Sequence, residues 1–405
     1  MKIGKGAVAA LVVSQVLLMS LWFSGAAILP ALVAETGQTA AHYSGLASFV
    51  QIGFVAGALL IAVLGLADKF DRRRLMSFCG FVAAFSNLLL IYPGPDHVGA
   101  YIGRFLVGAA LAGVYPVGMA IAASWGLARR GLMVGLLVSA LAFGGSLPHL
   151  AAFMGDVLTA AGWTGGVLMI SGLAALGAVV ALFIPLGSHL GGQAKLSGQH
   201  LLSAWREVRV RGAYLGYLGH MWELYAFWAW IGVALGPLAV AHIGLERADS
   251  LVTFVLIASG AVGCVAGSFL ADGYGKARLA RVALAGSAIF GFATALSLAF
   301  GPWWLTLIMA VGWGVTIIPD SPQFSALVAD YAPTGQGASL LVFQTALGFA
   351  LTAVVVDAVP GVASAIGWPL VLAVLACGPV LGWLATGGLA HIERVARGLV
   401  PHKEA

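Results

Sequence analysis

Three ionisable side chains lie inside long apolar stretches of this sequence, where a charge is costly. They are Arg104, Glu223 and Asp320, and each charge placed in hydrocarbon costs about 2.5–3.5 kcal/mol on insertion scales. Two histidines, His149 and His220, lie in similar stretches. A carboxyl group in such a place can hold a proton or a cation, a histidine can relay a proton, and a guanidinium group can bind an anion. These residue types indicate binding of protons and of polar or charged solutes inside a membrane.

His220 and Glu223 are three residues apart and therefore share one face of a helix, which Phe227 and Trp230 continue. We predict that Glu223 takes up and releases a proton, with His220 and Asp320 as its partners in proton coupling. The alternatives are a histidine that only packs and a glutamate that only neutralises a buried base.

Two prolines flank Asp320 in the segment Pro319-Asp320-Ser321-Pro322-Gln323. Proline removes a backbone donor and interrupts a helix. Interrupted helices are tolerated at membrane depth where they line a cavity. Pro319 and Pro322 therefore predict a kink that takes part in gating or binding, with a passive bend as the alternative.

Several polar and aromatic side chains could contact a solute, although a single tryptophan or glutamine in a helical bundle often only packs. The predicted solute contacts are Arg104, His149, Trp22, Gln51, Tyr115, Phe227, Trp230 and Gln344. No spacing of cysteines, histidines or acids suits a metal ion, and no nucleophile pattern or phosphate-binding glycine loop occurs. We expect no cofactor, no metal and no enzymatic activity.

Membrane-spanning helices must position these residues. Hydrophobic residues make up 61% of the 405 positions and charged residues 9%, against roughly 25% charged in soluble domains. A spanning helix needs about 20 mainly apolar residues, and such stretches recur along the chain, so we predict an all-α membrane protein with 12 transmembrane helices. The expected spans are 7–34, 43–67, 75–93, 98–124, 131–154, 164–187, 212–241, 250–271, 280–300, 303–329, 338–358 and 366–388.

The basic residues indicate the topology. With a cytoplasmic N-terminus, 18 of the 20 lysines and arginines fall on the cytoplasmic side, whereas Arg104 lies within a span and only Arg247 lies outside. Cytoplasmic loops carry such an excess of bases. We therefore predict a multi-pass protein of the inner (plasma) membrane with both termini cytoplasmic, and we interpret the net charge of +5 as topology rather than as nucleic-acid binding. Asp357, at the far end of the eleventh span, is expected to be solvated.

One long polar segment divides six spans from six. We predict a six-helix bundle over 1–187, a cytoplasmic linker over 188–211, a second bundle over 212–390 and a cytoplasmic tail over 391–405. Within the linker, Leu201, Leu202, Trp205 and Val208 fall on one helical face. This pattern predicts a short amphipathic helix at the membrane surface, with a solvated linker as the alternative.

The two halves share a short motif. Leu66-Ala67-Asp68-Lys69-Phe70-Asp71-Arg72-Arg73 follows the second span, and Leu270-Ala271-Asp272-Gly273-Tyr274-Gly275-Lys276 follows the eighth, at an offset of 204 residues. The first copy resembles the Gly-x-Leu-Ala-Asp-Arg-x-Gly-Arg-Arg motif of the major facilitator superfamily, although Asp71 stands where that family usually has glycine. Twelve spans in two parallel repeats also fit this family.

The resemblance implies two pseudo-symmetric bundles that rock about a central site. It also implies that the first helix of each three-helix unit lines that site. Helices of this kind carry Arg104, His220, Glu223 and Asp320. The motif residues would then latch the cytoplasmic ends of the two halves. The implied gating residues are Asp68, Lys69, Arg72, Arg73, Asp272 and Lys276, with Pro319 and Pro322 at the kink. Anchoring of the topology by the arginines is the alternative.

The sequence thus favours a secondary active transporter, coupled to protons, that moves a small polar or anionic organic solute. We expect a monomer in the lipid bilayer whose partners are the solute and protons. Arg104 would hold the negative charge of the solute and Glu223 the proton. The alternatives are a proton-linked efflux antiporter of amphipathic or cationic compounds and, from another class, a membrane receptor or lipid flippase on the same scaffold.

Overall fold

The computed structural model describes residues 4–125, 130–158, 162–187, 204–245, 247–334 and 336–396, and within these ranges every regular element is helical. The first part of the chain forms α1 (Lys5–Met19), α2 (Ser24–Thr36), α3 (Gly45–Leu64), α4 (Leu66–Lys69), α5 (Arg72–Asn87), η1 (Leu88–Leu90), α6 (Val98–Leu111), α7 (Tyr115–Ser124), α8 (Arg130–Leu158) and α9 (Gly162–Ala181). The second part forms α11 (Val208–Ile243), α12 (Ala248–Tyr274), α13 (Lys276–Phe300), α14 (Trp303–Thr316), α15 (Ser321–Tyr331), α16 (Gly337–Ile366), α17 (Trp368–Ala385) and α18 (Gly387–Ala396).

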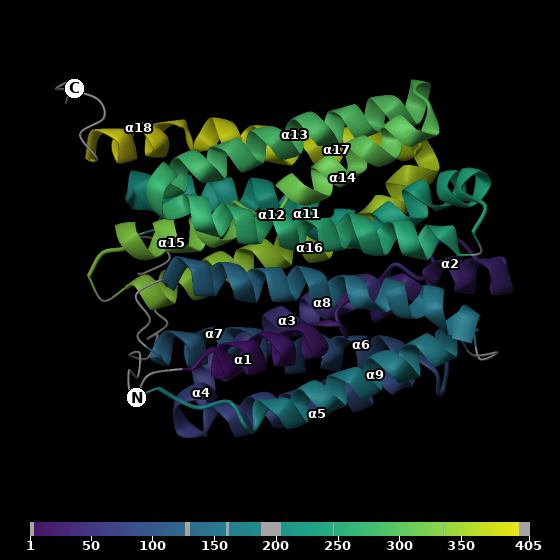
Figure 1. Cartoon of the computed structure of the whole chain (residues 1–405), viewed down its shortest axis with the longest axis horizontal. Helices are drawn as coiled ribbons and strands as arrows, with labels where there is room; N and C mark the ends of the chain where they lie inside the picture. The colour runs from purple at the N-terminus through teal and green to yellow at the C-terminus, as the bar shows by residue number, and fades with distance from the viewer. Residues whose placement is uncertain are drawn as a thin grey trace.

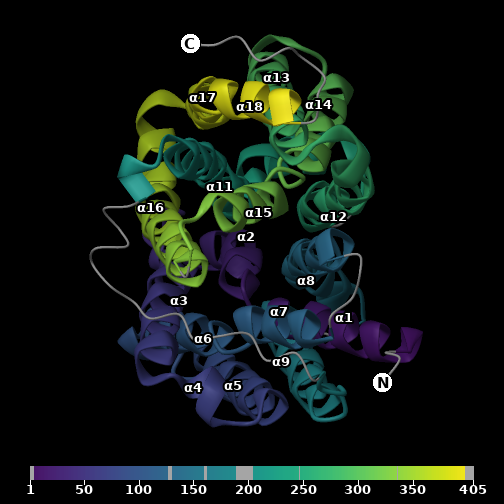
Figure 2. The ribbon, with the colours of Figure 1, turned by 90° about the vertical axis from the view of Figure 1, so that its left-hand side faces the viewer.

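The helices form two bundles that lie side by side (Figures 1 and 2). Helices α1 to α9 build one bundle and α11 to α18 the other. The bundles meet mainly where α8 runs along α12 and where α3 runs along α16. Helix α18 and the start of α1 lie toward the same end of the molecule (Figure 1), as an even number of spans requires. Which side of the membrane this end faces stays a prediction.

Within the described residues, eleven helical segments are long and apolar enough to cross a membrane. The remaining predicted span corresponds to α5, which has 16 residues and begins with three arginines. The predicted linker falls largely on residues 188–203, which lie outside the described ranges, so its amphipathic helix stays a prediction. Helix α18 extends into the predicted tail, and residues 397–405 lie outside the description.

Three spans are interrupted near their middle. The interruptions lie at residues 20–23 between α1 and α2, at 112–114 between α6 and α7, and at 317–320 between α14 and α15. In the first, the hydroxyl groups of Ser20 and Ser24 donate to the carbonyls of Leu17 (2.6 Å) and Leu21 (2.9 Å). Such local bonds compete with the helical ladder. The interrupted spans are the first helices of three of the four three-helix units, so backbone groups are freed close to the interface between the bundles.

Helices α3 and α6 pack in close contact through glycines. A Cβ atom at Gly53 would lie 2.0 Å from the Phe105 carbonyl oxygen, and one at Gly108 would lie 2.0 Å from that of Val50. Small residues let membrane helices approach in this way. This contact holds the second span against the fourth and fixes the position of Arg104 on α6 relative to α3.

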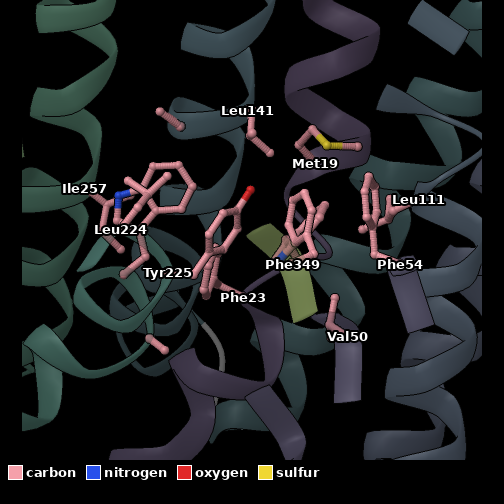
Figure 3. Packing of buried hydrophobic residues seen from close by; sticks show 14 of the residues in the cluster. Met19, Phe23, Val50, Phe54, Leu111, Leu141, Leu224, Tyr225, Ile257 and Phe349 are labelled. Atoms are coloured by element: carbon pink, nitrogen blue, oxygen red, sulfur yellow. The ribbon is translucent and has the colours of Figure 1, made fainter. Parts of the chain in front are cut away.

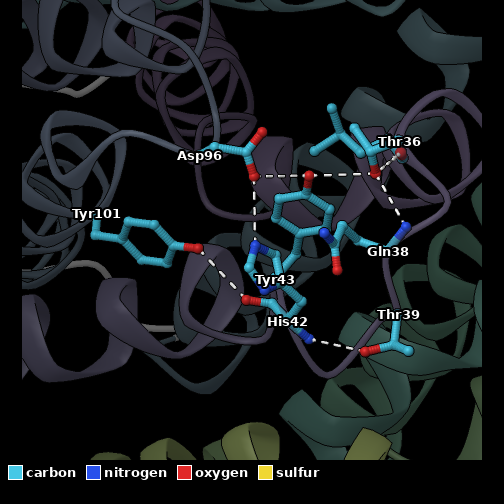
Figure 4. Close-up of polar contacts among 8 residues, drawn as sticks. Thr36, Gln38, Thr39, His42, Tyr43, Asp96 and Tyr101 are labelled. Carbon is cyan, nitrogen blue, oxygen red and sulfur yellow. Dashed lines mark hydrogen bonds and ion pairs between the residues drawn. The ribbon is translucent and has the colours of Figure 1, made fainter.

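At the end opposite the start of α1, a polar network ties the α2–α3 turn to the segment before α6 (Figure 4). The Tyr43 hydroxyl donates to Oδ1 of Asp96 (2.9 Å), and Nε2 of His42 lies 3.3 Å from the same oxygen. The Tyr101 hydroxyl donates to the His42 carbonyl (3.4 Å). These contacts lie within the first bundle and stabilise its outer end.

Each copy of the repeated motif leads into a helix whose first turn is capped by a carboxylate, but the carboxylates come from different places. In the first copy, Oδ1 of Asp71 accepts from the backbone N–H groups of Arg73 (2.9 Å) and Arg74 (3.4 Å). The Arg73 side chain also donates to Asp71, which lowers the pKa of that carboxyl to about 2. In the second copy, Gly275 stands at the equivalent position, with φ at 102°.

Glu393 of α18 supplies the carboxylate that Gly275 lacks. Its oxygens accept from the backbone N–H groups of Lys276 (2.8 Å), Ala277 (3.0 Å) and Arg278 (3.3 Å) at the start of α13. A negative charge is favourable at this end of a helix. Helix α18 is therefore joined to the loop that carries the second motif.

We expect Glu393→Ala to destabilise the protein by about 1 kcal/mol, the usual cost of a lost helix cap. Thermal unfolding in detergent would measure this loss. Asp330→Ala is the matched control, because the exposed Asp330 side chain pairs with the half-buried Lys276 side chain (2.5 Å) and surface ion pairs contribute little. Equal stability of the Glu393→Ala and wild-type proteins would contradict the capping role.

Candidate functional site

Six buried aromatic side chains meet where the two bundles face each other, and Figure 3 labels four of them. The ring centroid of Trp22 lies 5.5 Å from that of Tyr225 and 5.4 Å from that of Phe349, and Phe54 lies 4.5 Å from Phe349. Each side chain is at most 6% exposed. These rings pack against one another across the interface between the bundles. We call the following residues the interhalf aromatic cluster: Trp22, Phe23, Phe54, Tyr225, Trp228 and Phe349.

The interruption of the first span places two members of this cluster. Trp22 and Phe23 lie in the segment between α1 and α2. The ring of Phe23 contacts that of Trp228 edge to face at 5.6 Å. The interruption also leaves the carbonyls of Leu21 and Trp22 outside the regular helical ladder.

The side chain of Arg104 donates hydrogen bonds to both of these carbonyls. Its Nη1 donates to the Leu21 carbonyl (3.1 Å) and its Nη2 to that of Trp22 (2.5 Å). Nε donates to the Leu46 carbonyl of α3 (2.9 Å), and Nη1 also donates to the side chains of Ser24 (2.8 Å) and Asn87 (3.0 Å). The side chain is fully buried. Arg104 thus joins the interrupted first span to the second and third spans, and its donors are engaged by the protein itself.

Several buried side-chain nitrogens have no hydrogen-bond partner within the described part of the chain. The Trp22 indole donates to Oε1 of Gln51 (2.9 Å). Because an indole only donates, this bond fixes the amide and leaves Nε2 of Gln51 unpaired. Other buried side-chain nitrogens without a partner include Nε2 of Gln344, Nε1 of Trp228 and Nε2 of His149. Buried polar groups are normally paired, so these donors suit a ligand rich in acceptor oxygens.

Three tyrosines add hydroxyl groups from both bundles. Tyr115 begins α7 of the first bundle, whereas Tyr217 and Tyr225 belong to α11 of the second. Both Tyr115 and Tyr217 lie close enough to Tyr225 to interact with it electrostatically. Tyr115, a predicted solute contact, is thus within electrostatic reach of Tyr225, one member of the aromatic cluster.

Glu223 lies on the other side of α11, inside the second bundle. Its Oε1 accepts from the Ser287 hydroxyl of α13 (2.6 Å), and its Oε2 accepts from the Trp313 indole of α14 (2.9 Å). Glu223 is fully buried. An isolated carboxylate in hydrocarbon is costly, and both of its partners here are neutral. The arrangement can hold either a carboxylate or a carboxylic acid.

His220 and Asp320 form a second pair of buried titratable groups one turn away. Nδ1 of His220 lies 2.9 Å from Oδ1 of Asp320, at the interruption between α14 and α15. Neither side chain exceeds 2% exposure, and Asp320 interacts electrostatically with Glu223. The structure therefore brings together the three residues that the sequence analysis assigns to proton coupling.

Comparison with known families gives a match over most of this molecule. The model of the Major Facilitator Superfamily matches residues 11–355. The chain belongs to the major facilitator superfamily. It is accordingly a multi-pass membrane transporter rather than an enzyme, and the predicted fold class is confirmed.

Solved structures of this superfamily have the same fold. The xylose transporter XylE from E. coli, in a partially occluded inward-open conformation, shares 15% sequence identity with a TM-score of 0.72, over 93% of this chain and 95% of that one. A D-xylose–proton symporter shares 16% sequence identity with a TM-score of 0.73, over 94% of this chain and 96% of that one. The proton:xylose symporter XylE bound to 6-bromo-6-deoxy-D-glucose shares 15% sequence identity with a TM-score of 0.71, over 94% of this chain and 95% of that one. No curated protein sequence matches the chain.

Two of the predicted solute contacts of this transporter have their described partners within the second bundle. Phe227 packs against Trp313 at 4.9 Å between ring centroids, on the same side of α11 as Glu223. The Trp230 indole donates to the Val356 carbonyl of α16 (2.8 Å), within the second bundle. Tyr225 and Trp228 of the same helix do contact the first bundle.

The described contacts of the gating residues stay within one bundle. Arg72 donates to the carbonyls of Ala67 (3.3 Å) and Ala120 (3.4 Å), Arg73 pairs with Asp71 (2.7 Å), and Lys69 is exposed. The side chains of Asp68 and Asp272 lie outside the description, so their gating role stays a prediction. Pro319 and Pro322 lie at the interruption of the tenth span, and their gating role also stays a prediction.

A polar contact between the bundles was not expected from the sequence. Oδ1 of Asp357 on α16 accepts from the hydroxyl groups of Ser44 (2.9 Å) and Ser48 (3.0 Å) at the start of α3. Asp357 was expected to be solvated, and it is exposed, but it also bridges the halves. The negative charge lies at the N-terminal end of α3, which stabilises it.

Proposed function

We propose that this transporter couples the movement of a small polar solute to the movement of protons by alternating access. The observation that carries the proposal is the interhalf aromatic cluster with unpaired donors around it, next to a bundle that buries Glu223, His220 and Asp320. Aromatic rings and a few polar groups are the usual lining of a small-molecule site. Rocking of the two bundles would expose this site to each side in turn.

The charges favour a neutral solute over an anionic one. The guanidinium group of Arg104 already donates hydrogen bonds to backbone carbonyls, to Ser24 and to Asn87. The unpaired donors at the cluster are the Gln51 amide and the Trp228 indole, which bind hydroxyl and carbonyl oxygens without needing a countercharge. A compact solute with several hydroxyl groups fits this set. The similar structures named above include xylose transporters, which supports the same solute class.

The aromatic cluster also suits a second candidate, the efflux of cationic or amphipathic compounds. Tryptophan and tyrosine faces attract cations. A cation would need a carboxylate near the rings, however, and Glu223 and Asp320 are engaged by Ser287, Trp313 and His220. We therefore keep the neutral solute as the proposal.

The localisation and gating proposals follow from the basic residues. We propose that the chain lies in the inner (plasma) membrane as a monomer with both termini cytoplasmic, and that Asp68, Asp272 and the bases beside them latch the cytoplasmic ends. A reporter fused after Lys195 should then read cytoplasmic, which an external reading would contradict.

Transport by proteoliposomes tests the proposed function directly. Purified protein would be reconstituted with a pH-sensitive dye trapped inside and exposed to three classes of solute: neutral sugars, carboxylates and lipophilic cations. The proposal expects proton movement that depends on a neutral sugar. Proton movement that only a lipophilic cation evokes would support the efflux candidate instead.

The glutamines near the cluster give a specific prediction. We expect Gln51→Leu and Gln344→Leu each to lower the apparent affinity for the solute roughly tenfold, because one hydrogen bond to a buried ligand is lost. Gln15→Leu is the matched control, since Gln15 is equally buried but its amide nitrogen donates to the Val114 carbonyl (3.2 Å) within the first bundle, and its unpaired atom is the oxygen Oε1. Equal loss in all three variants would indicate a general packing defect rather than a solute site.

A further inference from the structure

We propose that the Ser287 hydroxyl accepts a hydrogen bond from the protonated carboxyl group of Glu223. The hydroxyl group would change from hydrogen-bond donor to acceptor when Glu223 takes up a proton. This inference rests on the proton coupling at Glu223 proposed above. It adds a positioning residue that could not be selected from the sequence, because Ser287 is one of many serines in apolar stretches.

The geometry limits where a proton can bind. The two oxygens of Glu223 have different partners: the Ser287 hydroxyl at Oε1 (2.6 Å) and the Trp313 indole at Oε2 (2.9 Å). All three side chains are at most 1% exposed. They come from α11, α13 and α14, so this contact joins three helices of the second bundle.

The two partners differ in chemistry. An indole N–H only donates, whereas a hydroxyl both donates and accepts. A proton on Oε2 would set an O–H group against the Trp313 N–H, leaving two buried donors facing each other. A proton on Oε1 only requires the Ser287 hydroxyl to turn, so that its oxygen accepts from Glu223.

The turned hydroxyl still has an acceptor for its own hydrogen. Serine in a helix commonly donates to the carbonyl four residues earlier, which for Ser287 is that of Ala283 on α13. The proton balance is then complete: one proton from water binds Oε1, Oε2 keeps the Trp313 bond, and release of the proton reverses both changes. The titratable groups beside this centre are Asp320, which interacts electrostatically with Glu223, and its partner His220.

Infrared spectroscopy of the purified transporter in detergent tests this inference without a known solute. Lowering the pH should produce the carbonyl band of a protonated carboxyl group, and the band that is absent in Glu223→Gln belongs to Glu223. We expect this band to shift in Ser287→Ala, which removes the acceptor, and to stay in place in Ser287→Thr, which retains a hydroxyl. Ser297→Ala is the matched control, because this buried serine of α13 donates to the Thr294 carbonyl (3.1 Å).

A second measurement uses Glu223→Gln as a fixed copy of the protonated form. Its amide N–H would donate to Ser287 while its amide oxygen accepts from Trp313. In that background Ser287→Ala should lower the Tm, and Ser287→Thr should not. An unshifted Glu223 band together with an unchanged Tm would overturn the role of Ser287 and leave coupling at Glu223 intact. The absence of any band that depends on Glu223 would overturn the coupling proposal itself, and this inference with it.

Discussion

Glu223→Gln is expected to abolish accumulation of the solute against its gradient, while exchange of solute between identical solutions continues. Glutamine has the shape of the protonated acid and can keep contact with both Ser287 and Trp313, but it cannot release a proton. The carrier would therefore still change conformation with solute bound, and the step coupled to the gradient would be lost. Proteoliposomes with and without an imposed pH gradient would measure both activities, and we expect accumulation to fall to the level of protein-free liposomes.

Asp320→Asn separates the two acids, because it removes the carboxylate that faces His220 and leaves Glu223 with its own partners. If Glu223→Gln still accumulates solute and Asp320→Asn does not, the coupling proton belongs to the His220–Asp320 pair. If both variants lose exchange as well as accumulation, the acids stabilise the second bundle and do not couple transport.

The cost of burying charge made the acids and Arg104 recognisable in the sequence, but it could not identify their partners. Most contacts of Arg104 are backbone carbonyls near the interruption of the first span, and backbone groups look the same at every position of a sequence. The sequence could therefore show that Arg104 needs compensation, and not that the protein itself provides it.

The rotation of α11 was equally inaccessible to sequence reasoning. A helical period of 3.6 residues places His220, Glu223 and Phe227 on one face, which the structure reproduces. A helix surrounded by protein is apolar on every side, however, so periodicity does not tell which face meets which neighbour. Tyr225 and Trp228, which contact the first bundle, carry no mark that separates them from Phe227 and Trp230. The contact of Asp357 with Ser44 was hidden for another reason, since 313 residues separate the two in the chain.

Arg104→Lys is expected to destabilise the transporter by roughly 2–5 kcal/mol and to change the apparent affinity for a neutral solute much less. Arginine reaches acceptors on three separate spans with its planar fork. A lysine ammonium group donates from a single atom, so at least two buried acceptors would lose their partner, at about 1–3 kcal/mol each. Thermal unfolding in detergent and the yield of folded protein would measure the loss, with the KM for solute measured on the protein that remains.

The balance between these two readouts decides what Arg104 does. Arg209→Lys is the matched control, because Arg209 is exposed and lies over the Tyr331 ring at 5.6 Å; it should affect neither quantity. A large rise in KM for a carboxylate at unchanged Tm would show that Arg104 binds an anionic solute, as the sequence alone suggests. A fall in Tm with little change in KM would instead assign to Arg104 the support of the interrupted first span, which positions Trp22 and Phe23 between the two bundles.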